Sequence, residues 1–498
     1  MKLRGPAGNA PQDRHAAPES LRRSALFAGA VQLAGTVFTA ILTLYLVRAL
    51  PREEYGEFAI ALAVGAVVVL PSDFGVSSSA ARYLAESFGD SSRSLMVIST
   101  AIKLKAFISV FVGSAIFIAA EPIAHAYGHP ALVAPLRLIA IAVTAQTIFG
   151  LTLSLFTALR RMRTVFSIAT AESAAEMSAT ILLVSLGGGV IGATLGRALG
   201  YTLGAAFGIL LLARHQGGLG IIRTPFQRRL GASIARYAGA VAVVDAIWAM
   251  LSQLDVLIMG AILSVPAVAA FQAPARLLSL ATYPGMALAN AFGPRVADRA
   301  DMARTSAALV SAVRRLLLLQ GFAAAVVAAY ADVIVHLALG HRYVGTSAES
   351  VLRVMSPFVL LSGLAPLFST TIDYLGGARR RIPIAAATLF VNVTINLLLL
   401  RRIGPVAAAI AVDAGYFVFV FGHAFVATRL LGLDLRSIGR TLAAVTVAAT
   451  LMTATVGLIR ASSGGVPVAI VAGIAGSGLF AAAVVVLRQH RVLLNRRS

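Results

Sequence analysis

The C-terminal region contains the run Val466-Pro-Val-Ala-Ile-Val-Ala-Gly-Ile-Ala-Gly-Ser-Gly-Leu-Phe-Ala-Ala-Ala-Val-Val-Val-Leu487, in which no residue is charged. A helix needs about 20 mostly apolar residues to cross a bilayer, so this run is long enough to span one. Similar runs recur along the whole chain. The sequence therefore predicts about 14 transmembrane helices, at residues 24–47, 57–80, 95–120, 131–157, 166–186, 189–213, 235–261, 265–292, 314–338, 351–376, 382–400, 405–428, 439–459 and 466–487.

The composition excludes the other common classes of protein. Of the 498 residues, 58% are apolar and only 12% are charged, and the mean hydropathy is +0.86. Soluble domains carry about 25% charged residues, which hydrate their surfaces. A soluble multidomain enzyme, a disordered protein and a fibrous protein are therefore excluded. An all-α polytopic membrane protein is predicted.

The distribution of Lys and Arg predicts how the helices are oriented. With the N-terminus in the cytoplasm, 29 of the 42 Lys and Arg fall in cytoplasmic segments and 6 in outer segments, and the rest lie within spans. Cytoplasmic loops of membrane proteins carry such an excess. The net charge of +22 is thus explained by topology and not by binding to nucleic acid, and both termini are predicted to be cytoplasmic.

The predicted helices group into two sets of six, followed by two more. We expect a six-helix bundle at 24–213, a cytoplasmic linker at 214–234, a second bundle at 235–428 and two accessory helices at 439–487, between a disordered cytoplasmic tail at 1–23 and a basic cytoplasmic tail at 488–498. Both bundles begin on the cytoplasmic side, so they would be parallel repeats. Three identities at an offset of 213 residues support a repeat: Phe58 with Phe271, Pro71 with Pro284, and Arg82 with Arg295.

Motifs for enzymatic chemistry are absent from the sequence. None of the three lysines follows a glycine-rich loop, so the chain has no P-loop for nucleotide hydrolysis. It contains neither a His-Glu-x-x-His zinc motif nor a Gly-x-Ser-x-Gly nucleophile turn, and it has no cysteine. We therefore expect a transporter without a catalytic residue, metal site or cofactor. Coupling to a proton or sodium gradient is left open.

Three predicted helices carry polar residues along one face. At 100° per residue, side chains three or four positions apart lie on the same side of a helix. Such a face in a membrane indicates either a water-filled lumen or hydrogen bonds to a neighbouring helix. We favour a substrate-binding lumen for the third stripe and leave both interpretations open for the first. The stripes are Gln32, Thr36, Thr39 and Thr43; Asp245, Trp248, Ser252 and Asp255; and Gln272, Arg276, Ser279, Tyr283 and Asn290.

Arg276 is the strongest single candidate for substrate binding, because it lies in the middle of its predicted helix. A charged group within a membrane is costly and usually has a function. A guanidinium is always charged and binds phosphate through two parallel hydrogen bonds, so it suits a diphosphate. The alternative is an ion pair with Asp255 or Asp245 that only stabilises the fold.

Glu172 and Glu176 lie one helical turn apart. Two carboxylates so close in a low-dielectric medium cannot both ionise cheaply, so one should hold a proton near neutral pH. The pair is therefore a candidate for ion coupling, and Asp73 is another. Pairing of these glutamates with Arg197 on the next helix is the alternative.

Several motifs resemble those of a known family. Leu46-Val-Arg-Ala-Leu-Pro-Arg-Glu-Glu-Tyr-Gly-Glu-Phe58, followed by Asp73-Phe-Gly75, is similar to the opening of Wzx-type bacterial polysaccharide flippases. Asp255-Val-Leu-Ile-Met-Gly260 resembles a later motif of the same family, and Gly404–Ala409 resembles a late turn but lacks one of its glycines. These flippases form the polysaccharide transporter branch of the multidrug/oligosaccharidyl-lipid/polysaccharide exporter superfamily.

The resemblance implies a fold like that of the multidrug exporters (MATE-like) and a specific activity. The protein would translocate an undecaprenyl-diphosphate-linked oligosaccharide from the cytoplasmic to the periplasmic leaflet of the bacterial inner membrane by alternating access. Its partners would be this substrate, membrane lipids, a polysaccharide polymerase and glycosyltransferases. The cationic lumen of the family would map onto Arg276, Arg197 and Arg137. Alternatives are a drug or cation antiporter of the same superfamily and a polysaccharide polymerase or ligase.

Overall fold

The computed structural model describes residues 21–73, 75–87, 90–215, 218, 220–297, 302–462 and 466–487, without the side chains of some of them, such as Asp73 and residues 235–249. Within these ranges the chain forms helices and turns and no strand. The predicted all-α class is confirmed. Each of the fourteen predicted runs falls on one helix or on two or three consecutive helical segments.

Apolar runs of about 20 residues become long helices because a helix satisfies its backbone hydrogen bonds internally. The first half of the chain forms α1 (Leu21–Ala49), α2 (Arg52–Asp73), α3 (Val76–Glu86), α4 (Ser91–Ala126), η1 (Pro130–Leu132), α5 (Val133–Ala158), α6 (Met162–Leu183), η2 (Val184–Gly188), α7 (Gly189–His215) and α8 (Gly220–Arg223).

The second half continues with α9 (Arg228–Ile262), α10 (Val265–Ser279), η3 (Leu280–Thr282), α11 (Tyr283–Ala297), α12 (Met302–Ala329), α13 (Ala331–Ile334), η4 (Val335–Leu339), η5 (His341–Tyr343), α14 (Ser347–Val354), α15 (Ser356–Tyr374), η6 (Ala378–Arg381), α16 (Ile382–Ile403), α17 (Pro405–Leu431), α18 (Leu435–Ser462) and α19 (Val466–Val486).

By length and composition alone, nine helical segments of the described residues could cross a membrane, or ten if the bent pair α14 and α15 is one span. This number counts α6, η2 and α7 as one segment of 54 residues, although the chain turns back between them at Gly187, whose φ is 87°. A left-handed φ of this kind is easy only for glycine. The predicted break between residues 186 and 189 is therefore present.

Other predicted runs are interrupted as well, and two of these breaks bear on the predicted site. The run 57–80 divides at Gly75, which has a φ of 60° and separates α2 from α3. The run 265–292 divides at the 3-10 turn η3 into α10 and α11, each of 15 residues. A 3-10 turn changes the rotation per residue, so the faces of α10 and α11 are offset from those of one continuous helix.

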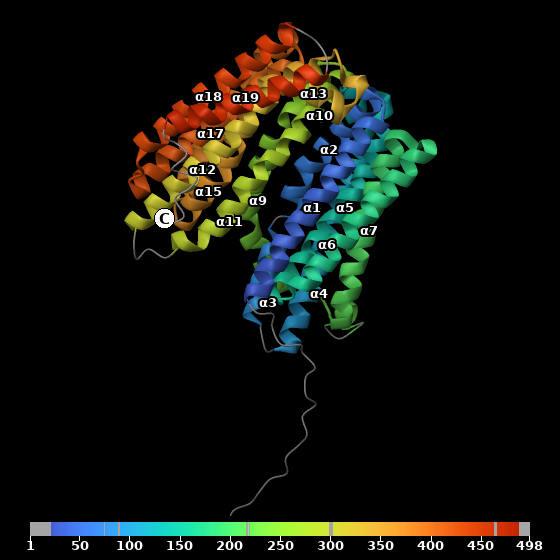
Figure 1. Ribbon diagram of the computed structural model, residues 1–498. Coiled ribbons are helices and arrows are strands. Elements are labelled where there is room, and N and C mark those ends of the chain that lie inside the picture. Colours follow the sequence, from blue (N-terminus) through green and yellow to red (C-terminus); the bar gives the residue numbers. More distant parts are fainter. Residues whose placement is uncertain are drawn as a thin grey trace, which may run out of the picture.

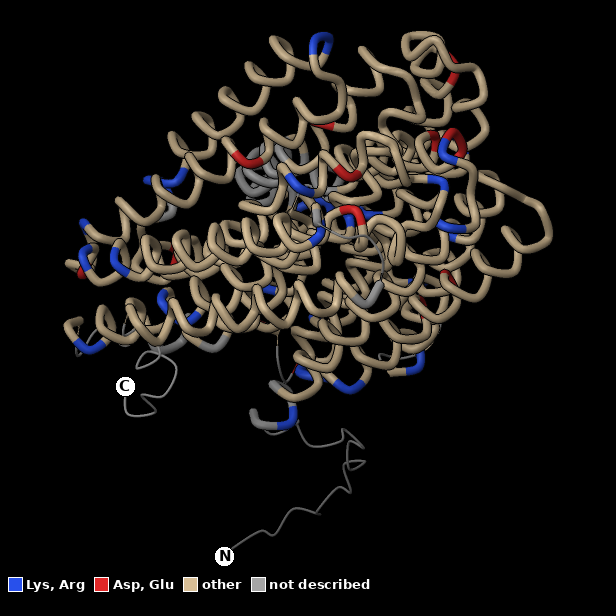
Figure 2. The backbone as a smooth tube through the Cα atoms, turned by 45° about the horizontal axis from the view of Figure 1, so that its top comes forward, with Lys and Arg blue, Asp and Glu red and all other residues tan. Residues whose placement is uncertain are grey.

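Figure 1 shows two groups of helices that converge near α2, α10 and α13 and diverge toward α3 and α11. Helices α1 to α7 form the first group, and α12 and α15 to α19 belong to the second. Between them, α9 and α10 pack against α2, and α9 also contacts α16. Helices α18 and α19 pack together beside α12. Figure 2 shows that most Lys and Arg lie near helix ends, as expected for helices whose middles lie in lipid.

Where the groups converge, two arginines connect them through backbone carbonyl groups. Arg48 lies in the last turn of α1 and donates to the carbonyl oxygens of Ala338, at 3.1 Å, and Leu337, both in η4. In return, Arg342 donates to the carbonyl oxygen of Ala49 at 3.3 Å. Each cation therefore caps the C-terminal end of a helix in the other half, where the helix dipole is negative. We call Arg48 and Arg342 the arginine clasp.

Replacing both clasp residues, as Arg48→Ala with Arg342→Ala, should loosen this end of the molecule. Each exposed arginine contributes about 0.7 kcal/mol, so the double variant should populate the state open at this end about tenfold more. The chain has no native cysteine, so Leu50→Cys, at a position only 1% exposed, can report the opening through alkylation. Alkylation should become about tenfold faster. An unchanged rate, equal to that of an Arg401→Ala control, would contradict this role.

Candidate functional site

A cavity of about 520 Å³ lies between the first group of helices and the central helices α9 to α11. Its wall is formed mainly by α1, α2, α5, α6 and α7, and α9, α10 and α11 complete it. The first predicted stripe faces this cavity, so its threonines line a hollow as well as a helix interface. The predicted site residues found in the wall are Gln32, Thr36, Thr39, Thr43, Glu172, Glu176, Arg197, Gln272, Arg276 and Tyr283.

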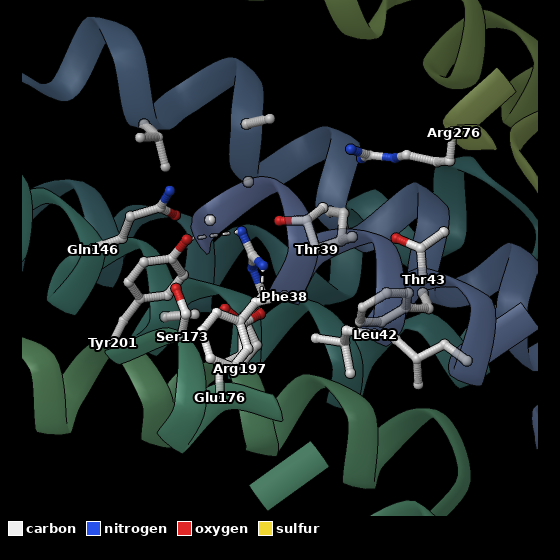
Figure 3. A pocket seen from close by; sticks show the side chains of 18 of the residues that line it. Phe38, Thr39, Leu42, Thr43, Gln146, Ser173, Glu176, Arg197, Tyr201 and Arg276 are labelled. Carbon is white, nitrogen blue, oxygen red and sulfur yellow. Dashed lines mark hydrogen bonds and ion pairs between the residues drawn. The ribbon is translucent and has the colours of Figure 1, made fainter. Parts of the chain in front are cut away.

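Arg276 reaches this cavity from α10 and is partly buried. Figure 3 shows its guanidinium pointing toward Thr39 of α1, while Arg197 enters from another side. Among the described residues, none forms a hydrogen bond or ion pair with the guanidinium of Arg276. A cation held in this way can bind an anionic group without first breaking an existing pair.

A second cavity of about 280 Å³ lies on the other side of Arg276. The two cavities share Arg276, Gln272, Ser252 and Gln253, so these residues form a junction between them. The second cavity extends toward α15, α16 and α17, and its wall includes the predicted residues Asp255 and Ser279. Arg276 therefore stands where a ligand could contact both cavities.

Asp255 is buried and is bound by α16, not by Arg276. Its Oδ1 accepts hydrogen bonds from the side-chain amides of Asn392, at 2.9 Å, and Asn396, at 2.7 Å. Hydrogen bonds from these amides stabilise a carboxylate that has been removed from water. The predicted alternative of an Arg276–Asp255 ion pair is therefore wrong in this structure.

Arg197 is held in a fixed position by its neighbours. It donates to Oε1 of Glu176 at 2.6 Å and to the hydroxyl of Tyr201 at 3.2 Å, and its guanidinium carbon lies 4.9 Å from the centre of the Tyr201 ring. Glu172 accepts a hydrogen bond from Ser173 at 3.1 Å, but its Oε1 is buried and accepts none from the described residues. The predicted pairing with Arg197 thus exists for Glu176 and not for Glu172.

A row of glycines on one face of α7 sets the positions of the Glu172 and Glu176 carboxylates. Gly196, Gly200 and Gly204 recur every four residues and face α6, a spacing that lets membrane helices approach closely. A Cβ atom at Gly200 would lie 2.5 Å from the Cβ of Glu176, and one at Gly204 would lie 2.7 Å from the Cγ of Glu172. The close contact of α6 with α7 fixes both glutamates at the cavity wall.

The remaining predicted residues lie elsewhere. Asn290 is exposed on α11 and lines neither cavity, whereas Tyr283 at the start of α11 lines the larger one. Arg137 lies 3.9 Å from Glu121 and is also absent from both walls. The side chains of Asp73 and Asp245 lie outside the described residues.

Two sets of polar side chains at the site were not predicted from the sequence. Gln146, Ser173 and Tyr201 line the larger cavity from α5, α6 and α7, and α16 presents Asn392 and Asn396 to Asp255. A signal for both was present, since glycines recur every four residues along α7 and the two asparagines are also four residues apart. Neither pattern indicates which helix is the neighbour.

The comparisons with known proteins agree with this architecture. The model of a family described as "Polysaccharide biosynthesis protein" matches residues 21–291, which is more than half of the chain. The chain belongs to this family. The predicted relationship to polysaccharide flippases is thereby confirmed. A search of curated proteins found no significant match to this chain.

Solved structures with the same fold include several transporters. A lipid II flippase MurJ in an inward closed conformation is 12% identical, with a TM-score of 0.74. This match covers 93% of our chain and 99% of the MurJ chain. An inward-facing multidrug resistance MATE family transporter of the MOP superfamily is 13% identical, with a TM-score of 0.66. This match covers 82% of our chain and 99% of the transporter. Another MOP superfamily transporter, from Pyrococcus furiosus, is 14% identical, with a TM-score of 0.52. This match covers 81% of our chain and 93% of that transporter.

Such low identities establish the fold alone, and the family match adds the biological setting. The chain is therefore a member of this polysaccharide biosynthesis family, and it has the multi-pass helical fold of these membrane transporters. The prediction of a MATE-like fold is confirmed.

Proposed function

We propose that the protein carries an undecaprenyl-diphosphate-linked oligosaccharide from the cytoplasmic to the periplasmic leaflet of the bacterial inner membrane. The product would serve surface or exopolysaccharide biosynthesis. The observation that carries this proposal is the guanidinium of Arg276, which has no partner among the described residues and stands at the junction of two cavities. Glycosyltransferases would supply the substrate, and a polymerase would consume it.

Electrostatics explains why such a substrate needs this site. Moving a bare diphosphate through hydrocarbon would cost tens of kcal/mol by Born solvation. A polar cavity with Arg276 at its edge replaces part of the hydration of the diphosphate, and the glycan meets hydroxyl and amide groups of α1, α5 and α6. The lipid tail stays in the bilayer. A single arginine that none of the described residues pairs also lets the substrate leave more easily than a cluster of cations would.

The excess of Lys and Arg supports an orientation with both termini in the cytoplasm. The arginine clasp then closes the periplasmic end, and the cavity receives substrate from the cytoplasmic side. Rocking of the two helix groups would open the clasp and release the substrate outside. Deletion of the gene should abolish surface polysaccharide without changing resistance to cationic drugs. The reverse result would support a drug or cation antiporter instead.

Glu172 is our candidate for coupling this cycle to a proton gradient, because its buried Oε1 has no partner while Glu176 is paired with Arg197. In proteoliposomes, Glu172→Gln should transport at a rate that no longer responds to an imposed pH gradient, whereas the wild-type rate should change severalfold. Ser185→Ala, at an exposed site near the end of the same helical segment, is the control. Equal responses of wild type and Glu172→Gln would exclude this role, and a response to sodium alone would indicate the other ion.

A further inference from the structure

The smaller cavity has two chemically different walls. One wall, on α9 and α10, carries most of the polar groups, with Ser252, Gln253, Gln272 and Arg276 beside the apolar Val256, Phe271 and Ala275. The opposite wall comes from α15 and α17 and is rich in aromatic rings, with Phe358, Tyr416 and Phe419 as its members. The cavity is therefore amphipathic across its width.

The aromatic wall is packed firmly. The rings of Phe358 and Tyr416 meet edge to face, with their centroids 4.8 Å apart, and Tyr416 also lies beside Phe419 at 6.4 Å. Phe358 and Phe419 are only 6% and 4% exposed. Rings held in this way offer a preformed surface, so a ligand would lose little free energy in ordering them.

The size and polarity of the cavity exclude several ligands. Its volume of about 280 Å³ lies near the lower limit for small-molecule sites, so an oligosaccharide does not fit. A hydrocarbon chain would cover the polar wall and leave its amides and the Asp255 carboxylate without water, which is costly. A second anionic group is excluded as well, because it would lie close to the Asp255 carboxylate.

A single pyranose matches both walls, because its C–H groups form an apolar face and its hydroxyl groups form a polar edge. We propose that this cavity is a monosaccharide subsite for the sugar attached directly to the diphosphate. Its C–H face would lie against Tyr416 and Phe358, and its hydroxyl groups would bond to Gln253 and Gln272. This inference rests on the proposed function, with the diphosphate on Arg276, and the further sugars continue through the junction into the larger cavity.

The test compares two lipids on the purified full-length protein in nanodiscs: farnesyl diphosphate and farnesyl diphosphate bearing one glucose. Calorimetry gives the dissociation constant of each. The wild type should bind the glucosylated lipid about tenfold more tightly, as one ring contact and one or two hydrogen bonds predict. Tyr416→Ala and Phe358→Ala should each remove most of this preference, and Tyr416→Phe should keep it.

Phe417→Ala is the matched control, since Phe417 follows Tyr416 on α17 but is 53% exposed and lines neither cavity. It should retain the preference. A wild type that binds both lipids equally would overturn the subsite and leave the proposed function intact. Equal weakening of both lipids by Tyr416→Ala would assign the cavity to the prenyl chain and also overturn it. Failure of the wild type to bind either lipid would contradict the proposed function itself.

Discussion

Replacing Arg276 with alanine should abolish export of the polysaccharide while the protein remains at normal abundance. The guanidinium is the cation at the cavity junction that no described residue pairs, so its loss leaves the diphosphate without a counter-charge. Hydrogen bonds to charged groups contribute about 1.5–3 kcal/mol each, so two of them correspond to a loss of affinity of at least about 100-fold. Surface polysaccharide, measured beside protein level by immunoblot, gives the readout.

Arg276→Lys should retain part of the export, because an ammonium keeps the charge but loses the bidentate geometry. Arg402→Ala serves as the control, since Arg402 is exposed at the end of α16 and lines neither cavity. Full export by Arg276→Ala would refute the role of this residue. Arg276 would then be a structural residue only.

Gly200→Leu should destabilise the protein strongly. The added side chain would collide with α6 at Glu176, where even a Cβ atom would lie 2.5 Å from the glutamate Cβ. Overpacking costs about 1–3 kcal/mol in ordinary cores and more where backbones touch, so we expect a loss of about 3 kcal/mol or more. The separation of α6 from α7 should also break the Arg197–Glu176 ion pair.

Thermal unfolding of the purified protein in detergent measures this effect. Gly457→Leu is the matched control, because Gly457 lies within α18 and has open space where its Cβ would be. The control should unfold close to the wild-type temperature. If Gly200→Leu did the same, the close contact between α6 and α7 would be incorrect.

Local periodicity predicted which residues share a helical face, and this is why the stripe from Gln32 to Thr43 does line the cavity. The same reasoning failed at Asn290, because it assumed one continuous helix through residues 280–282, where the chain forms η3. Pro284 was the signal in the sequence, because a proline cannot bond to the carbonyl group four residues before it, here that of Leu280. Tyr283, directly after the turn, still lines the larger cavity, whereas Asn290, about two helical turns further on, lines neither cavity.

Contacts between helices were harder to predict than faces within one helix. Asp255 could pair with any cation or amide that the fold brought near it, and the structure selects Asn392 and Asn396, more than 130 residues away. The glycines of α7 indicated a close contact but not its partner. Tertiary pairing of this kind depends on the arrangement of whole helices, which one sequence does not encode in a readable pattern.

The most direct test of the central claim is transport by the purified protein in liposomes. Undecaprenyl diphosphate linked to an oligosaccharide with a fluorescent label is placed in both leaflets, and an impermeant quencher is added outside. The account predicts that label from the inner leaflet becomes quenched in vesicles with the wild-type protein, and that Arg276→Ala vesicles behave like protein-free ones. Equal protection of the inner label with and without the wild-type protein would contradict it.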